Sequence, residues 1–487
     1  MTIAAQLPTD AALSGPEPDP QARAFRADFD ALLGRYRTGR LAGSELRAWH
    51  RDRLAGVLRH VTARSRFYRD HLAGVDLGAV SPEDLSALPF TTKADLRREL
   101  HGVLSGTPAD AAVYYETTGT TGPSTPCPRA AIDLHASDAH VVESLRQLFA
   151  HRFGSRKPVI GLMGPSELYA FGDTFGDAAR AIGAAHVKIW PESPRVGFAK
   201  ALRLMHELGV EVVVCAPALC LSLAKAARHH GYDLQRDLAV KLFLVLGEIC
   251  TPAFAANVAS IWNAPALSTL YGSQEAMAIA AGCTRGRLHL SQPNYLVEVL
   301  DPATGAVRGS RGEGELCLTM LVPGIKPLIR YRTGDLVSVD GTACDCGLPG
   351  QVIEVQGRVA DELVLNGDGV RASDLEQAVL EGVEGALGYQ VVVDDGPDGA
   401  DRLTVRLELL TERAAEAGRL RSAIGARIES RFGVRADVLV IDELDPITAT
   451  GSFVSWKAAR LLDQRAGATN PDVAAARAAA ARQVVTS

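Results

Sequence analysis

The sequence predicts an α/β protein with a large N-terminal domain and a small α+β C-terminal domain. Between residues 110 and 280, short β-branched or apolar runs alternate with helical segments, which is typical of a largely parallel sheet. Strands dominate from 293 to 356 and indicate a compact, mostly β subdomain of the large domain. From 358 onward, a strand–helix–strand–strand–helix–strand order spans about 100 residues, enough to fold independently.

The length of the chain favours two or three domains, since 487 residues exceed one ordinary domain. The first residues lack the basic start and apolar block of a secretory signal and are typical of a disordered leader. Helical spacing begins at 23, and the last stretch is rich in Ala and Arg. We therefore expect a leader (1–22), a large domain (23–356), a small mobile domain (357–465) and an Ala-rich tail (466–487).

Composition excludes some classes of partner. The chain is 47% hydrophobic and 22% charged, as globular proteins are, and its formal charge of -6 argues against nucleic acid or an anionic membrane as the main partner. The most apolar stretch, 210–224, is interrupted by Glu211 and Pro217 and is too short to span a bilayer. We expect a cytoplasmic protein whose eight cysteines are thiols or metal ligands.

The strongest local motif is the run from Thr117 to Thr125, TTGTTGPST. Glycines let a backbone turn tightly and approach a ligand, and hydroxyls and free N–H groups suit phosphate oxygens. The alternative is an ordinary surface loop, which such clusters usually form.

Four further motifs carry chemistry. Glu275 ends the run YGSQE after an apolar segment, where a carboxylate can hold a metal that carries phosphates. Asp335 ends the turn YRTGD and can accept hydrogen bonds from ribose hydroxyls. Gly357-Arg358 marks the junction of the two domains, and Lys457 lies near the C-terminus. Taken alone, each of these four motifs is also consistent with solvent-exposed side chains or with a structural turn.

The order and spacing of these motifs resemble the adenylate-forming (acyl-CoA synthetase, luciferase-like) superfamily, and within it the phenylacetate–CoA ligase-like branch. The resemblance runs over about residues 85 to 463. It includes GRVADELVLNG after the junction and three smaller matches, namely Leu88 to Arg97, Ala216 to Leu219, and Lys326 to Asp335.

The resemblance implies an ATP-dependent enzyme that activates an organic acid as acyl-AMP, with the small domain acting as a lid and coenzyme A as the usual acceptor. It implies Lys457, Glu275 and Thr120 as catalytic residues, with Glu275 holding Mg²⁺. The phosphates of ATP would be bound by Thr117, Thr118, Gly119, Thr120, Thr121 and Gly122. The adenosine would be bound by Gly247, Glu248, Tyr271, Gly272, Asp335 and Arg358.

Three departures from the family pattern affect these expectations. The phosphate loop lacks the lysine that many relatives carry after the second glycine, although Arg129 lies nearby. Ala360 occupies the usual acidic hinge position, and Trp456 stands where relatives often have glycine. The hinge change weakens the expectation of thioester formation more than that of adenylation.

A metal site is a separate hypothesis. Cys283 and His289 form one close pair, and Cys344 and Cys346 form another about 55 residues later. Four such ligands suit a tetrahedral Zn²⁺, and some members of the resembled branch carry a similar structural zinc site. The alternative is reduced thiols beside a surface histidine.

The substrate is the least defined feature. The segment from Ser166 to Gly176 resembles the family's acid pocket, and its Tyr169 and Phe171 could stack on an aromatic acid, although both also suit a core. We expect an aromatic or unsaturated acid as the small-molecule partner. The sequence leaves open whether the protein forms a homodimer.

Two alternatives remain open at the level of function. Relatives with this fold activate nitrite to diazotise an aryl amine, or join an activated acid to an amine. A catalytically inactive nucleotide-binding or interaction protein is the third possibility.

Overall fold

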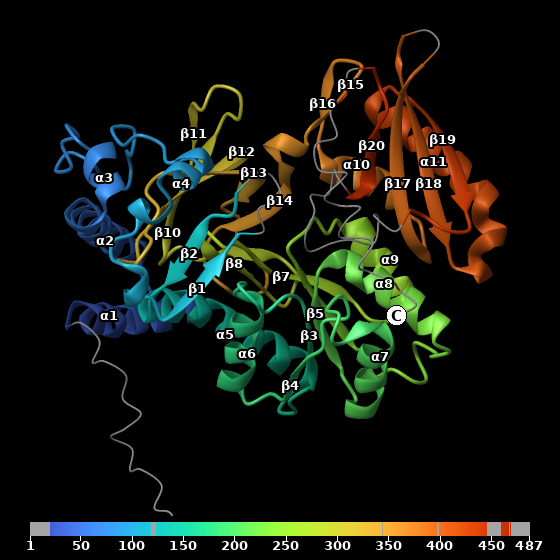
Figure 1. Ribbon diagram of the computed structural model, residues 1–487, viewed down its shortest axis with the longest axis horizontal. Coiled ribbons are helices and arrows are strands. Elements are labelled where there is room, and N and C mark those ends of the chain that lie inside the picture. The colour runs from blue at the N-terminus through green and yellow to red at the C-terminus, as the bar shows by residue number, and fades with distance from the viewer. Residues whose placement is uncertain are drawn as a thin grey trace, which may run out of the picture.

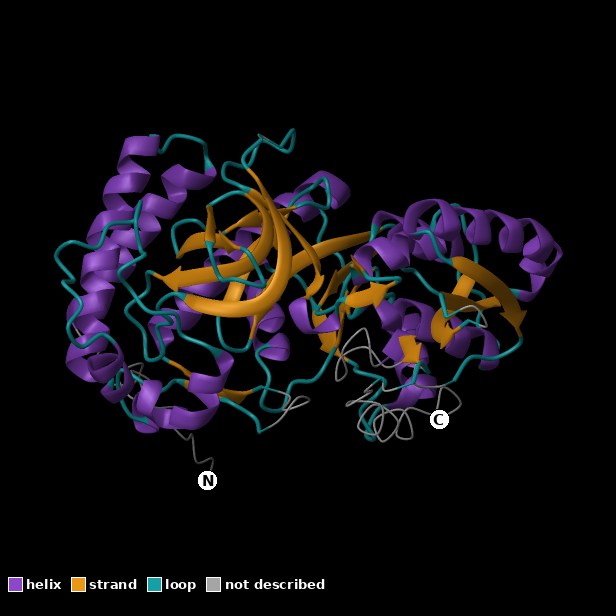
Figure 2. Ribbon diagram, turned by 90° about the horizontal axis from the view of Figure 1, so that it is seen from above, coloured by secondary structure: helices purple, strands orange, loops and turns teal. Residues whose placement is uncertain are grey.

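A computed structural model describes residues 20–117, 123–342, 344–396, 399–445, 459–466 and 468. Its main element is a single sheet of 12 strands in the order β11-β10-β12-β13-β14-β9-β8-β7-β6-β5-β3-β4. A separate 4-stranded sheet, β19-β18-β17-β20, forms the core of a small C-terminal unit. Figure 1 shows the small unit beside the large one, and Figure 2 shows the strands of the large unit curving between helices.

The parallel half of the large sheet is covered by helices on both faces. Its strands are β3 (Ile160–Met163), β4 (His186–Lys188), β5 (Val212–Cys215), β6 (Leu242–Leu246) and β7 (Ala266–Ser273). Its helices are α5 (Ala131–Phe153), α6 (Phe171–Ile182), α7 (Gly197–Leu208), α8 (Pro217–His229) and α9 (Pro252–Trp262).

The side chains of the central strands explain this double covering. On β5, Val212 and Val214 pack in the core that contains α5 and α6, whereas Val213 packs in the core that contains α7, α8 and α9. Successive side chains of a strand point to opposite faces, so an uninterrupted apolar run requires helices on both sides.

The strands after β7 continue the same sheet. They are β8 (Met277–Gly282), β9 (Leu288–Leu290), β10 (Tyr295–Leu300), β11 (Val307–Gly309), β12 (Gly312–Met320), β13 (Tyr331–Asp340) and β14 (Val352–Arg358). The region 293–356 is mostly β, as predicted, but it shares one sheet with the parallel strands, because β14 pairs with β9 and β8 pairs with β7.

Helices and one hairpin complete the large unit. The helices α1 (Pro20–Arg37), α2 (Gly43–Arg64), α3 (Arg66–His71) and α4 (Lys93–Glu99) precede the hairpin of β1 (Val113–Glu116) and β2 (Pro126–Arg129). Apolar side chains of α2 and α3 pack in one core with those of β10, β12 and β13. Residues 1–19 of the expected leader (1–22) lie outside the described residues. Helix α1 begins at Pro20, within the range expected for the leader.

The small unit contains the element order predicted from the sequence. It comprises β15 (Leu363–Leu365), β16 (Asp368–Val370), α10 (Ala372–Leu380), β17 (Ala386–Asp395), β18 (Asp401–Leu409), α11 (Ala417–Phe432), β19 (Arg435–Ile441) and β20 (Leu461–Asp463). The α/β class, with a large unit followed by a small one, is therefore confirmed.

The small unit packs on the helices α8 and α9, so these helices are buried on two sides. Apolar residues of α8, α9, α10 and the 4-stranded sheet belong to one continuous core. Buried polar groups add specificity. The Asn257 side chain donates to the carbonyl oxygen of Ala386 and accepts from its N–H, both at 2.8 Å, and the Glu376 carboxylate accepts from the N–H of Thr251 at 3.2 Å.

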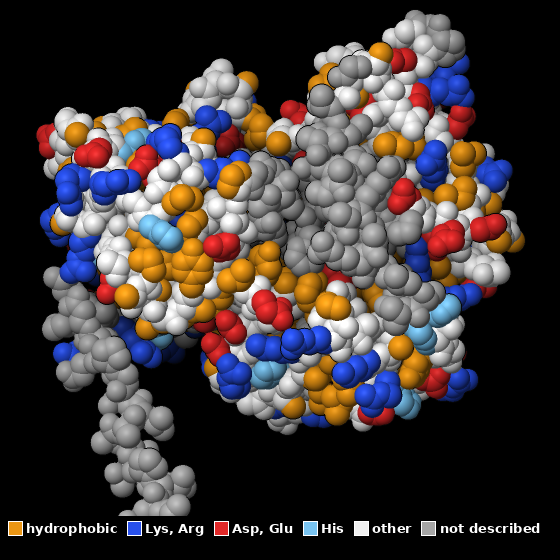
Figure 3. Space-filling model, in the orientation of Figure 1, with side chains coloured by type: hydrophobic (Ala, Val, Ile, Leu, Met, Phe, Trp, Pro, Cys, Tyr) orange, Lys and Arg blue, Asp and Glu red, His pale blue; other side chains and the backbone are white. Residues whose placement is uncertain are grey.

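The outer surface shows mixed charge. On the face in Figure 3, Lys and Arg side chains are interspersed with Asp and Glu. Within the described residues, no helix is both long enough and apolar enough to cross a membrane.

We expect Asn257→Ala to lower the free energy of unfolding by about 2–3 kcal/mol, because it leaves the N–H and C=O of Ala386 without buried partners. Thermal and urea unfolding would measure the change. Ser422→Ala, on the exposed face of α11, is the control. An unfolding midpoint of Asn257→Ala equal to that of the control would contradict this role of Asn257.

Candidate functional site

A cleft of about 680 Å³ lies where β6 and β7 end and where β13 and β14 meet. In open α/β sheets, ligands bind beyond the carboxyl ends of the strands, and this volume is within the range of small-molecule sites. The cleft brings together eight of the predicted nucleotide-site residues, namely Thr117, Gly247, Glu248, Tyr271, Gly272, Glu275, Asp335 and Arg358.

One wall of the cleft follows β6. Gly247 has a φ of 88°, a conformation that favours glycine and turns the chain directly after the strand. The next side chain, Glu248, is 5% exposed and lies 3.5 Å from the Arg460 guanidinium of the small unit. Burial raises the pKa of Glu248, although the charge of Arg460 opposes the rise. This ion pair joins the cleft to the chain segment that follows residue 458.

The floor of the cleft is the turn between β7 and β8. Gly272 is required there, because a Cβ on it would lie 2.0 Å from the carbonyl oxygen of Met277. Glu275 follows in the turn and is only 4% exposed. The buried Arg129 guanidinium donates to the carbonyl oxygens of Gln274 and Glu275 at 2.5 and 2.6 Å, which fixes the backbone of the turn.

The surroundings of Glu275 favour the ionised form of its carboxyl despite its burial. Burial alone would raise the pKa of its carboxyl, but the positive charges of Lys93 and Lys326 outweigh that effect and hold the pKa below its ordinary value. The Lys93 ammonium is 3.1 Å from Oε1 of Glu275. A buried, ionised carboxylate is a ligand that Mg²⁺ prefers.

Asp335 and Arg358 face each other across two paired strands. They are register partners in the antiparallel pairing of β13 with β14, and Arg358 Nε lies 3.6 Å from Asp335 Oδ1. The Tyr271 hydroxyl donates to Asp335 Oδ2 at 2.7 Å. Burial raises the pKa of Asp335, while Arg358 and Tyr271 act against the rise. The carboxylate is therefore fixed at the edge of the cleft.

The phosphate-loop motif connects β1 to β2. Thr117 closes the base of the loop, because its N–H donates to the carbonyl oxygen of Thr125 at 3.1 Å and its hydroxyl accepts from the Thr125 N–H at 2.9 Å. The predicted residues Thr118, Gly119, Thr120, Thr121 and Gly122 lie outside the described residues, as does Lys457.

Two predicted substrate residues do not line the cleft. Phe171 begins α6 and packs beside the α5–α6 core, with its ring 5.4 Å from that of Phe175. Tyr169 is half-buried, and burial raises the pKa of its hydroxyl. Arg129, considered as a substitute for the missing loop lysine, is fully buried beneath the turn and does not line the cleft.

Two lysines that sequence reasoning left without a role lie near Glu275. Lys326 is fully buried and donates to the carbonyl oxygen of Pro126 at 2.5 Å, and burial lowers its pKa. Lys93 begins α4 and lines the cleft. A signal for Lys93 was present in the run TTKAD, since Thr92 and Asp95 form a capping box that fixes the start of a helix.

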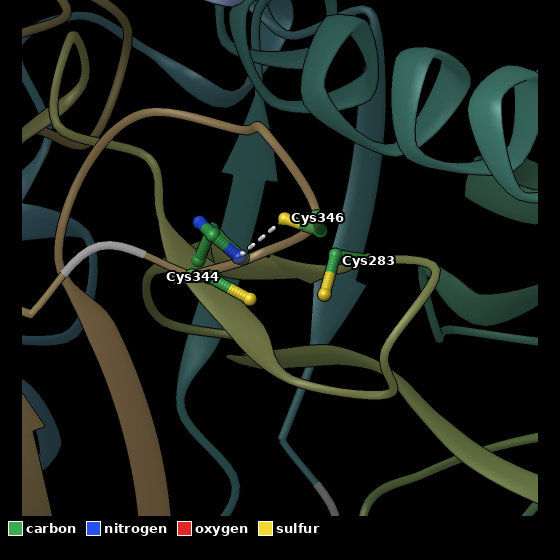
Figure 4. Close-up of side chains that lie close together, drawn as sticks. Cys283, Cys344 and Cys346 are labelled. Atoms are coloured by element: carbon green, nitrogen blue, oxygen red, sulfur yellow. Dashed lines mark hydrogen bonds between the residues drawn. The ribbon is translucent and has the colours of Figure 1, made fainter.

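The four predicted metal ligands form a cluster outside the cleft. The ligand atoms of Cys283, His289, Cys344 and Cys346 all lie within 4.8 Å of one another. Figure 4 shows the three thiols converging, and Cys346 Sγ is 3.3 Å from Nε2 of His289. The other ring nitrogen lies 3.3 Å from the carbonyl oxygen of Pro349, the arrangement that orients a metal-binding imidazole. Three thiols and one imidazole fit a tetrahedral zinc ion.

Comparison with known proteins identifies the family. A family model described as AMP-binding enzyme matches residues 52–320, more than half of the chain. The chain belongs to the AMP-binding enzyme family. It is an enzyme of the AMP-forming, acid–CoA ligase-like class, so the family predicted from the motifs is confirmed.

Individual relatives are similar in sequence to this chain along most of their length. Phenylacetate-coenzyme A ligase of Thermus thermophilus is 28% identical over 425 residues, which are 82% of this chain and 93% of that protein. The ligase of the same name from Aromatoleum evansii is 26% identical over 442 residues, 86% and 95% of the two chains.

A solved structure has the same fold. 2-Hydroxyisobutyryl-CoA ligase in its postadenylation state superposes with a TM-score of 0.74, covering 92% of this chain and 94% of that one at 18% identity.

Proposed function

We propose that this AMP-binding enzyme activates an aromatic or unsaturated carboxylic acid as its acyl-AMP, with release of pyrophosphate, and then transfers the acyl group to coenzyme A. The observation that carries the proposal is the cleft, where Thr117, Glu275 and the Asp335–Arg358 pair line one space at the carboxyl ends of the strands. The names of the phenylacetate-coenzyme A ligases support an aromatic acid and coenzyme A.

In the first step, a carboxylate oxygen of the acid attacks the α-phosphorus of ATP. A new P–O bond forms while the bond between the α-phosphorus and the oxygen bridging to the β-phosphate breaks. The products are acyl-AMP and pyrophosphate, and no proton is transferred because the acid is already ionised. Both reactants are anions, so the enzyme must align them and supply positive charge.

We assign these tasks to particular residues. Asp335 would accept hydrogen bonds from the ribose hydroxyls, while Arg358 and the Tyr271 hydroxyl hold its carboxylate in place. Thr117 and the loop Thr118–Gly122 would surround the outer phosphates, Gly247, Glu248 and Gly272 would border the adenine, and Lys457 would approach the α-phosphate. The buried, ionised Glu275 fits Mg²⁺, which when bound would neutralise phosphate charge.

In the second step, the thiol of coenzyme A would lose its proton to solvent and attack the acyl carbon, and AMP would leave with the electron pair of the broken C–O bond. We propose that the small domain, 357–465, moves between the two steps about the junction after β14. Gly357 there has a φ of 138°, and Ala360 follows within a single 3₁₀ turn, Val359–Asp361.

Ala360 also favours a second candidate function that does not use coenzyme A. A family hinge normally carries an acidic residue at this position, so its replacement is consistent with an enzyme that stops at the adenylate. Such an enzyme would pass the activated group to an amine, or activate nitrite for an aryl amine.

We further propose that Cys283, His289, Cys344 and Cys346 bind a structural Zn²⁺. The cluster joins β8 and β9 to the loop between β13 and β14. A metal there would fasten two distant segments of the chain beside the cleft, and it would take no part in the chemistry.

The function is tested with purified protein, ATP, Mg²⁺ and a panel of aromatic, unsaturated and aliphatic acids, together with nitrite with and without an aryl amine, by measuring AMP with and without coenzyme A. We expect AMP with an aromatic or unsaturated acid, and faster release when coenzyme A is added. AMP formed only with nitrite and an aryl amine would support the second candidate. Absence of AMP under every condition would contradict both.

Changing Lys457 to Ala should slow adenylate formation at least about 100-fold, because the charge it supplies stabilises the transition state, with little change in the affinity for ATP. Single-turnover assays and nucleotide titrations would separate these effects. Lys157→Ala, at an exposed position before β3, is the control. A normal rate in the Lys457 variant would show that another cation serves the α-phosphate.

Removing a proposed zinc ligand should remove the metal. We expect wild-type protein to contain about one zinc per chain by elemental analysis, and Cys344→Ser and Cys346→Ser to contain far less and unfold at lower temperature, because metal binding contributes to folding stability. Cys250→Ser, outside the cluster, should keep its zinc. Equal zinc content in all four proteins would exclude the site.

A further inference from the structure

We propose that Lys93 is the cation that binds the β- and γ-phosphates of ATP and the departing pyrophosphate, in place of the lysine absent from the phosphate loop. In the nucleotide-free protein, its ammonium neutralises Glu275. When the magnesium–nucleotide complex enters, the ammonium turns from that carboxylate to the phosphate oxygens. This inference rests on the proposed use of ATP.

The position of Lys93 supports the proposal. It is the one lysine among the described residues that line the cleft, and its side chain is 40% exposed there. Thr117 and Glu275 line the same cleft. Magnesium binds its oxygen ligands at about 2 Å, so an ammonium 3.1 Å from a magnesium-binding carboxylate lies within reach of the phosphates on that metal.

Backbone hydrogen bonds fix the position of Lys93 relative to the rest of the cleft. Thr91 pairs with Tyr331 as an isolated parallel bridge, its N–H donating to the Arg330 carbonyl oxygen and its carbonyl oxygen accepting from the Arg332 N–H, both at 3.0 Å. Tyr331 begins β13, the strand that carries Asp335. The helix start after Thr91 is then fixed by the Thr92–Asp95 capping box.

Two other cations near Glu275, Arg129 and Lys326, are unsuited to this task, and a third, Arg358, lies 3.6 Å from the Asp335 carboxylate. Arg129 is fully buried, and its guanidinium is already bonded to the carbonyl oxygens of Gln274 and Glu275. Lys326 is fully buried and donates to the carbonyl oxygen of Pro126. A lysine on a flexible four-carbon stem, with its head group in the cleft, can change partners without moving the backbone.

The charge balance gives the exchange a physical reason. Without nucleotide, Glu275 is a buried anion and requires a nearby cation. A bound Mg²⁺ would supply that charge itself and would repel the ammonium, while the outer phosphates would attract it. Lys93 would thus be released at the moment when a phosphate-binding cation is needed.

The test compares ligands that differ only in their outer phosphates. Titrations of ATP, pyrophosphate and AMP with Mg²⁺ are carried out on wild type, Lys93→Gln, Lys93→Arg and Lys241→Gln. We expect Lys93→Gln to weaken ATP and pyrophosphate binding about 10- to 100-fold, as loss of a charge-assisted hydrogen bond does, and to change AMP binding less than about twofold. Lys93→Arg should recover most of the affinity.

Lys241→Gln is the matched control. It removes the lysine of another lysine–glutamate pair, 2.8 Å from Glu211 and outside the cleft, and should leave all three affinities unchanged. Because AMP binding reports an intact cleft, equal loss of ATP and AMP affinity in Lys93→Gln would overturn the proposal, as would unchanged ATP affinity.

These outcomes are separable from the fate of the proposed function. A wild-type protein that binds neither ATP nor AMP would overturn both proposals. A wild-type protein that binds ATP through Lys93 but forms no adenylate with any acid or with nitrite would overturn the proposed function alone.

Discussion

The continuous sheet is the constraint on which the cleft depends. The walls of the cleft come from β6, β7, β13 and β14. The pair β6–β7 is connected to the distant pair β13–β14 through the pairings of β7 with β8, β8 with β9 and β9 with β14. Backbone hydrogen bonds fix the register of such pairs within one residue, since a slip by one would turn every side chain to the opposite face. The distance between Glu275 and Asp335 is therefore set by the backbone.

Buried charge is the second organising feature. Glu275 is almost inaccessible to water, and an unpaired carboxylate in that position would be strongly unfavourable. The fold compensates it with Lys93 and Lys326 and fixes its backbone through Arg129. The cost of ionising the carboxylate is thus met by the scaffold before any ligand arrives, which leaves a preorganised anionic group at the cleft.

Sequence reasoning predicted the parts of the site that depend on local pattern. Apolar runs predicted the strands, and the carboxylate of Glu275 was expected directly after one of them, where it lines the cleft. The pair Cys283 and His289 also meets the pair Cys344 and Cys346, although their spacing matches no standard zinc motif. The family resemblance supplied what local patterns could not, namely that the motifs belong together.

The remaining features depend on side-chain direction and on pairing between distant strands. Arg129 follows the loop closely in sequence, but its side chain points beneath the turn that carries Glu275. Phe171 packs against Phe175, because both lie on the inner face of α6. The strands from 293 onward showed no sequence signal for joining the parallel sheet, since β9 and β14 pair over a long separation.

The interface of the small unit limits how that unit can move. Asn257 and Glu376 satisfy backbone groups across the interface, and apolar side chains of α8 and α9 are covered by the small unit. A rotation would expose these groups together, and water could replace the hydrogen bonds but not the apolar contact. Any second position of the small unit must therefore bury comparable apolar surface. The Glu248–Arg460 pair, at the edge of the cleft, would have to break in the same movement.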